Sequence, residues 1–122
     1  MINFGNNFAV GILTTSGSGI PTAKSTRLLT GALKGTIVKS LEIMTGNESC
    51  YVEIIRTSGN EGNDPTEEVI SQNSYATIRI DMKANDYLVL WEGFFVIPNG
   101  KKLYFKSDST QCKAVVNYVE MT

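Results

Sequence analysis

The feature that most constrains the fold is a series of short β-type segments, separated by turn residues, that begins at Gly35. The segment SYATIRID at 74–81 alternates most regularly, with Ala76, Ile78 and Ile80 on one face and mainly polar side chains on the other. Similar segments occupy 35–44, 50–56, 87–91, 93–97, 102–107 and 111–121. One strand and one turn together take up roughly 8–12 residues, which is typical of a sandwich or a barrel. We therefore predict an all-β fold, an antiparallel β-sandwich.

The same alternation predicts which side chains face the core. Ile37, Leu41 and Ile43 are expected to share one face of a strand because they are separated by even numbers of residues. Leu103 and Phe105 are expected to share a face for the same reason. A third inward set is Cys50, Val52 and Ile54.

The stretch FFVIPNGKKLYFKS at 94–107 indicates two strands joined by a turn. We expect Pro98 at the first central position of that turn, because its fixed φ suits this position. Asn99 and Gly100 tolerate the unusual dihedral angles that follow. The turn chemistry predicts a corner between strands and contains no catalytic group.

Residues 1–33 differ from the rest of the chain. They hold five of the eleven glycines and no acidic residue, and the segment TTSGSGIPTAKST at 14–26 is typical of a connector. Several of their side chains are too apolar for a plain linker: Phe4, Phe8, Ile12 and Leu13. We predict an extended N-terminal arm over 1–33 that docks on a neighbouring subunit, followed by a sandwich domain over 34–122. A frayed terminus is the alternative.

The chain lacks the usual chemistry of enzymes. It contains no histidine, which removes the commonest general base and the commonest metal ligand, and it contains no nucleophile elbow or phosphate-binding loop. We therefore predict a protein that is not an enzyme and needs no cofactor or metal. Its net charge of −1 argues against nucleic acid as a partner. The chain has no long apolar run and no leader pattern. We therefore predict that it is neither inserted into a membrane nor secreted.

One acidic segment leaves its secondary structure open. In NDPTEEVIS at 63–71, Asp64 as N-cap and Pro65 at the first helical position would start a short helix, but a strand is equally compatible. The carboxylates of Glu61, Asp64, Glu67 and Glu68 lie close together in the sequence. We expect them to form a solvated loop tip, since their spacing does not match a calcium-binding loop.

The two cysteines also leave alternatives open. Cys50 and Cys112 both fall in strand-like segments and fit no zinc-binding spacing. They are either two small buried thiols or a disulfide between neighbouring strands, and the sequence does not decide between these states.

Aromatic and lysine side chains between 87 and 106 supply the remaining candidate contacts. Trp91 and Tyr104, together with Tyr87, could act as stacking platforms for a sugar, although large aromatic side chains also fill sandwich cores. Lys101 and Lys102 are candidate rim contacts, and the alternative is a solvated strand edge. A carbohydrate-binding module is therefore one functional hypothesis.

The C-terminal two-thirds of the chain resembles small all-β virion structural proteins of tailed bacteriophages. In those proteins a corner of the type Pro-x-Gly-x-x-Leu-x-Val precedes a last strand of the type V-x-V-x-x-S-Y-x-E. The matching residues are Pro98, Gly100, Leu103, Val116, Tyr118 and Glu120. Asn117 departs from the pattern, because the family often has serine there. The resemblance covers about residues 35–122 and does not include the arm.

The resemblance implies a jelly-roll-like or immunoglobulin-like sandwich carried in many copies on a virion that is assembled in the host cytoplasm. The expected role is capsid decoration or cement, with homo-oligomers, most often trimers, binding other virion proteins such as the major capsid protein. A neck, collar or tail station in the same particle is the alternative. An interface through Phe4, Phe8, Ile12 and Leu13 would fit either station.

Overall fold

The computed structural model describes residues 8–14 and 25–121 of the chain. These residues form eight strands and one helix. The elements are β1 (Phe8–Thr14), β2 (Thr26–Thr30), β3 (Thr36–Met44), β4 (Cys50–Thr57), α1 (Glu67–Asn73), β5 (Ser74–Met82), β6 (Tyr87–Ile97), β7 (Lys102–Ser107) and β8 (Lys113–Glu120).

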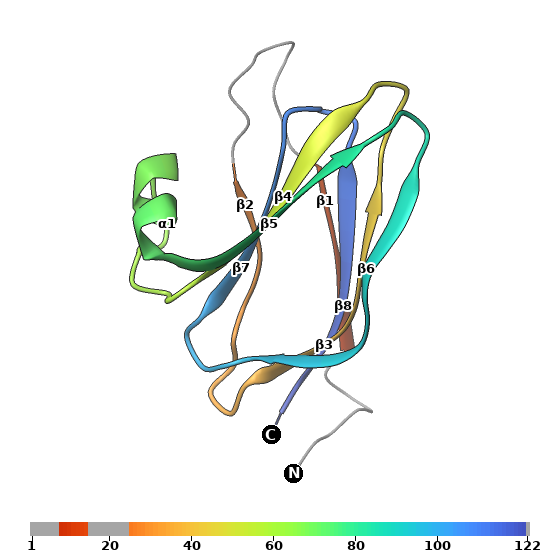
Figure 1. Cartoon of the computed structure of the whole chain (residues 1–122). Coiled ribbons are helices and arrows are strands. Elements are labelled where there is room, and N and C mark those ends of the chain that lie inside the picture. Colours follow the sequence, from red (N-terminus) through yellow and green to blue (C-terminus); the bar gives the residue numbers. More distant parts are fainter. Residues whose placement is uncertain (1–7, 15–24, 122) are drawn as a thin grey trace.

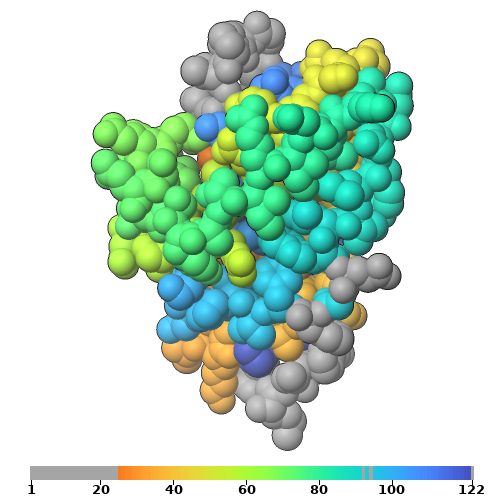
Figure 2. Space-filling model, in the orientation of Figure 1, coloured from red at the N-terminus to blue at the C-terminus, as the bar shows by residue number. Residues whose placement is uncertain are grey.

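The strands form two four-stranded sheets that pack face to face (Figure 1). The first sheet has the order β1-β8-β3-β6 and the second has the order β2-β7-β4-β5. Every pair of hydrogen-bonded neighbours is antiparallel. The prediction of an all-β antiparallel sandwich is therefore confirmed. The strands β5 and β6 follow each other in the chain and edge the two sheets on the same side (Figures 1 and 2).

The core lies between the sheets and is made of apolar side chains from both of them. Its fully buried members with the largest side chains are Phe105, Leu41, Ile43, Ile54, Ile97 and Leu103. The predicted inward faces of β4 and β7 are confirmed, because Cys50, Val52, Ile54, Leu103 and Phe105 all belong to this core. Tyr104, between two of these residues, lies on the opposite face of β7 with the smaller cluster of Ile55 and Ile70.

The predicted face of β3 is partly wrong. Leu41 and Ile43 belong to the core as expected, but Val38 joins them instead of Ile37. The register of β3 shifts between Val38 and Ser40 against both of its neighbouring strands. Such a bulge adds one residue to the strand and reverses the side-chain alternation beyond it. Ile37 is buried, but it is not part of the core between the sheets.

The acidic segment forms a helix, with its start later than predicted. Thr66 is the N-cap, and its hydroxyl accepts a hydrogen bond from the Val69 amide at 3.3 Å. Asp64 is exposed and precedes the cap. The helix α1 buries Ile70 against Ile55 and Tyr104 on the outer face of the second sheet, so this sheet is covered by apolar contacts on both faces.

Two segments of residues 1–33 are strands of the sandwich. The strand β1 pairs with β8 of the same chain over seven residues, and β2 pairs with β7. Phe8, Ile12 and Leu13 lie in β1, opposite Val119, Val115 and Ala114 respectively. Phe4 lies outside the described residues. The described part of the expected arm therefore contributes a strand to each sheet, and its docking on a neighbouring subunit stays a prediction.

The turn between β6 and β7 is displaced by one residue from its predicted position. The Lys101 amide donates to the Pro98 carbonyl at 3.1 Å, so Asn99 and Gly100 are the central residues. Gly100 has a φ of +77°, which fits the third position of a turn that favours glycine. The turn is anchored to the loop after β2, because the Gly31 amide donates to the Lys101 carbonyl at 2.8 Å and the Gly31 carbonyl accepts from the Gly100 amide at 3.1 Å.

A matched pair of glycine substitutions tests how tightly this turn is packed. Gly59 and Gly62 both have positive φ, but a Cβ at Gly59 would lie 1.9 Å from the Gly100 carbonyl oxygen, whereas a Cβ at Gly62 meets nothing within 4 Å. We expect Gly62→Ala to lower the free energy of unfolding by about 1–2 kcal/mol through backbone strain alone. Gly59→Ala should cost about 1–3 kcal/mol more, because the turn must move. Urea unfolding measures both, and equal losses would show that the contact is loose.

Candidate functional site

The most polar buried site lies where the loop between β4 and α1 folds over β7. The Glu61 carboxylate is fully buried and accepts hydrogen bonds at its Oε2 from the Thr57 hydroxyl at 2.6 Å and the Tyr104 hydroxyl at 2.8 Å. The Lys102 Nζ lies 4.0 Å from the same oxygen and donates to the Gly62 carbonyl at 2.6 Å. The predicted solvated loop tip is therefore wrong for Glu61. Its carboxylate fastens the loop to the sheet.

The charges at this site stabilise the ionised carboxylate. Burial by itself raises the pKa of Glu61, but hydrogen bonds from Thr57, from its own backbone amide and from Tyr104, together with the Lys102 charge, hold that pKa below its ordinary value. Burial and the Glu61 carboxylate raise the pKa of Tyr104 well above its usual range. Tyr104 therefore remains a neutral hydrogen-bond donor, and Glu61 remains an acceptor, over the physiological pH range.

This placement changes the expectations for two candidate contact residues. The side chain of Lys102 is 7% exposed, and Tyr104 is 3% exposed. Neither offers a surface to a partner, because the loop of Glu61 covers both. Tyr104 therefore lacks the open ring face that a sugar platform requires. Lys101 is half-buried and keeps access to solvent.

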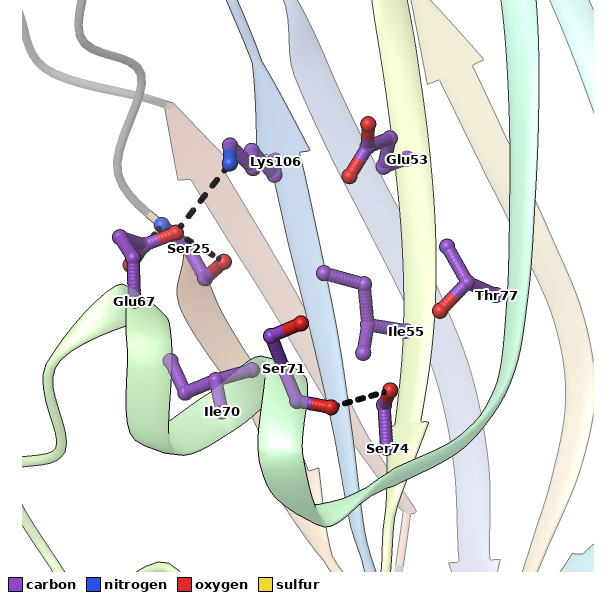
Figure 3. Close-up of a pocket in the computed structure, with 9 residues that line it drawn as sticks. All are labelled: Ser25, Glu53, Ile55, Glu67, Ile70, Ser71, Ser74, Thr77 and Lys106. Atoms are coloured by element: carbon purple, nitrogen blue, oxygen red, sulfur yellow. Dashed lines mark hydrogen bonds and ion pairs between the residues drawn. The ribbon is translucent and has the colours of Figure 1, made fainter.

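A cleft between α1 and the outer face of the second sheet is closed by internal charge pairing (Figure 3). The amide and hydroxyl of Ser25 donate to the two carboxylate oxygens of Glu67 at 3.0 and 2.7 Å. Lys106 comes from β7 and lies 3.5 Å from the same carboxylate. These contacts fasten the start of β2 to the helix. Both oxygens of Glu67 are thus engaged in contacts within the chain.

The described part of the chain contains neither a metal-binding cluster nor a helix that could span a membrane. Residues 8–14 and 25–121 include no group of three or more cysteine, aspartate or glutamate side chains that could hold a metal ion. Within the same ranges, α1 is the only helix, and it is far too short to span a bilayer.

A cation–aromatic cluster lies where β4, β5 and β6 approach one another. The Arg56 guanidinium carbon is 5.7 Å from the ring centroid of Tyr75, 5.9 Å from that of Trp91 and 5.8 Å from that of Phe95. The Lys101 Nζ is 4.9 Å from the Tyr75 ring. The rings of Trp91 and Phe95 are 4.3 Å apart, and both pack against the core. Trp91 is therefore partly a core residue, and its position in this cluster was not predicted.

Exposed apolar side chains gather on the two edge strands beside this cluster. The described residues contain six large exposed hydrophobic side chains, and all except Leu33 belong to β5 or β6. The five are Tyr75, Ile78, Tyr87, Val89 and Val96, which are 37–54% exposed. We call these five residues the β5/β6 surface. Figure 2 shows that the two strands form a continuous stretch of the molecular surface.

The sequence concealed this surface because alternation does not reveal which strands are edges. Ile78 was predicted to face inward, and it does lie opposite the core residue Ile54. However, β5 is the last strand of its sheet, so it has a neighbouring strand on one side only. Ile78 therefore remains 37% exposed. The sequence feature that could have indicated this surface is the presence of tyrosines in both segments, at 75 and 87.

The two cysteines are free, buried thiols. Burial, followed by the neighbouring Cys50 thiol, raises the pKa of Cys112 to about 12. Cys112 is therefore protonated at neutral pH and a poor nucleophile.

Substitution of the buried carboxylate tests the polar site. Glu61→Gln should lower the free energy of unfolding by about 2 kcal/mol at pH 7, because it removes a charged acceptor from Tyr104, Thr57 and Lys102. Since the folded-state pKa of Glu61 is lowered, its stabilisation is complete above the unfolded pKa of about 4.3 and is lost as pH falls through the folded value.

Chemical denaturation from pH 7 down to pH 3 measures this difference. The gap between wild type and Glu61→Gln should narrow below about pH 4. The exposed Glu68→Gln provides the control and should change stability little at any pH. A gap that stays constant across the range would contradict the charged role of Glu61.

Thiol labelling tests the state of the cysteines. We expect no reaction of either thiol with Ellman's reagent in the folded protein, because both are buried. Both should react in concentrated guanidinium chloride. The absence of any reactive thiol in the denatured, unreduced protein would instead demonstrate a disulfide between Cys50 and Cys112.

Comparison of the chain with protein-family models, with curated proteins and with solved structures found no match.

Proposed function

We propose that the sandwich is of the jelly-roll type. Eight strands in two four-stranded sheets support this assignment. The last strand, β8, returns to lie between β1 and β3, and β7 lies between β2 and β4 in the other sheet. Each of these late strands is thereby inserted between two early ones, as a pair of Greek-key connections requires. The immunoglobulin-like alternative would have seven or nine strands in a different order.

We propose that the protein is a non-enzymatic structural protein of a tailed-bacteriophage virion, and that it decorates or cements the capsid. The observation that carries this proposal is the concentration of exposed apolar side chains on the β5/β6 surface. Several exposed apolar side chains on two neighbouring edge strands favour a protein contact. Glu61 and Glu67 are each engaged in contacts that fasten one part of the chain to another, which favours a binding role over a catalytic one.

The resemblance noted in the sequence supplies the virion context. Its corner, Pro98 to Leu103, forms the connection from β6 into β7, and Val116, Tyr118 and Glu120 belong to β8. The motif residues therefore lie in a turn and in strands of the sandwich, where they help to define the fold. Their position is compatible with a family that keeps its fold and varies its surface.

The proposed mechanism is additive. Copies of the chain assemble as a homo-oligomer, with a trimer as the favoured state, and each copy buries one apolar patch against the shell. Several joined copies bind a repeating lattice more tightly than one copy, because the later contacts are intramolecular. An obligate contact of this kind buries on the order of 2,000 Å² or more. The arm residues Phe8, Ile12 and Leu13 remain proposed interface elements, since β1 is an edge strand.

A neck, collar or tail station in the same particle is the alternative. Copy number separates the two, because a decoration protein is present in far more copies than the subunits of one ring. Quantitative mass spectrometry of purified particles, calibrated against the major capsid protein, measures this number. Absence of the chain from purified particles would overturn both assignments.

Substitutions on the β5/β6 surface test the contact. We expect the double variant Ile78→Ser/Val89→Ser to reduce the oligomeric mass and to weaken binding to shells, because it removes exposed apolar area. Leu33→Ser is the matched control, since Leu33 is 81% exposed and lies outside the surface. Size-exclusion chromatography with light scattering and shell co-sedimentation measure the two effects. Equal oligomeric mass and equal shell binding in the two variants would show that the β5/β6 surface is not the contact.

A further inference from the structure

Two cations at one end of the β5/β6 surface have no acidic partner. Across residues 8–14 and 25–121, the side chains of Arg56 and Lys101 make no hydrogen bond or ion pair. Both instead lie over the ring of Tyr75, at 5.7 Å and 4.9 Å from its centroid. Two like charges on one ring create a local positive potential, and no carboxylate among the described side chains pairs with either cation.

The rings position the guanidinium group without using its donors. A cation over an aromatic face is attracted by the electron density of the ring, and this attraction leaves the N–H groups available. Arg56 meets Tyr75 of β5 and both Trp91 and Phe95 of β6, so its head group is held between the two sheets. The side chain is only half-buried. Its planar fork is therefore preorganised to donate two parallel hydrogen bonds.

The surroundings limit the chemistry of the acceptor. Tyr75 and Ile78 expose apolar area beside the two cations. The strand β5 is hydrogen-bonded to β4 on one side only, so its other edge offers backbone groups to an extended segment. A ligand that satisfies all three features carries a carboxylate, apolar side chains and a free peptide backbone.

We propose that Arg56 and Lys101 bind a carboxylate of an extended protein segment, an aspartate or glutamate flanked by apolar residues, which lies along β5. The carboxylate accepts from the Arg56 fork, and Lys101 adds a second charge from the turn after β6. The flanking apolar side chains cover Tyr75 and Ile78. This inference rests on the proposed role of the β5/β6 surface in protein contact, and it is independent of the virion assignment.

The single tryptophan of the chain makes the site directly observable. Trp91 lies beside Arg56, so its fluorescence should respond to an anion at the guanidinium group. The probe is the peptide acetyl-Leu-Glu-Leu-amide, with acetyl-Leu-Gln-Leu-amide as the uncharged match. We expect a saturable change with the glutamate peptide that weakens as salt is added, and at least a severalfold weaker response to the glutamine peptide.

Variants assign the binding to the two cations. Arg56→Gln should weaken binding by about tenfold or more, because two charge-assisted hydrogen bonds are lost. Arg56→Lys keeps the charge and the ring contacts, and should show an intermediate loss, so it tests the fork even if Arg56→Gln folds poorly. Lys101→Gln should weaken binding by about threefold, and the exposed Lys34→Gln should leave it unchanged. Thermal unfolding of each variant checks that it is folded.

Several results would overturn the proposal. Equal affinity for the glutamate and glutamine peptides would show that the site does not recognise the carboxylate. Saturable binding of inorganic phosphate or glucuronate, without binding of either peptide, would show that the ligand is another anion and not a protein segment. Unchanged binding in both folded Arg56→Lys and folded Lys101→Gln would place the site elsewhere. Peptide binding at Arg56 together with a β5/β6 double variant of unchanged mass would uphold this inference while removing the proposed oligomer contact.

Discussion

The structure depends on one constraint, which is that two open sheets share a single apolar core. Each sheet buries one face against the other, and the fully buried side chains of β3, β4, β7 and β8 account for most of that contact. An open sheet of four strands necessarily ends in two edges. Here one pair of edges is β1 and β2, and the other is β5 and β6. Among the described residues, the large exposed apolar side chains other than Leu33 lie on the second pair, and the two unpaired cations, Arg56 of β4 and Lys101 of the turn after β6, lie beside it. The candidate contact surface therefore follows from where the sheets stop.

The outer face of the second sheet is stabilised in part by pairing between polar groups. Its strands carry charged and hydroxyl groups, and the chain covers them with α1 and the loop that precedes it. The buried Glu61 is stabilised through its Oε2, which accepts from Tyr104 and Thr57, and the more exposed Glu67 is paired with Ser25. The contacts on this face therefore contribute to stability.

Much of the fold could be predicted from the sequence because side-chain alternation is a local property. The inward faces of β4 and β7 and the all-β class followed from it directly. The face of β3 did not, because the bulge after Val38 depends on pairing with two strands distant in sequence. The burial of Glu61 was missed for a related reason. A glutamate among glycines and asparagines resembles a solvated loop until β7 supplies Tyr104 and Lys102 beneath it.

The candidate site was harder to predict than the fold, since it depends on position within a sheet. Ile78 has the same local pattern as a fully covered core residue, and only the order of the strands leaves it partly exposed. Arg56 follows a run of buried residues and faces rings from two other strands. Whether Arg56 has an acidic partner depends on how β4, β5 and β6 come together, which the sequence around Arg56 does not reveal. Arg56 has no counter-charge among the described side chains and lies beside apolar area that they leave exposed, and this combination is the basis of our proposal that its partner belongs to another molecule.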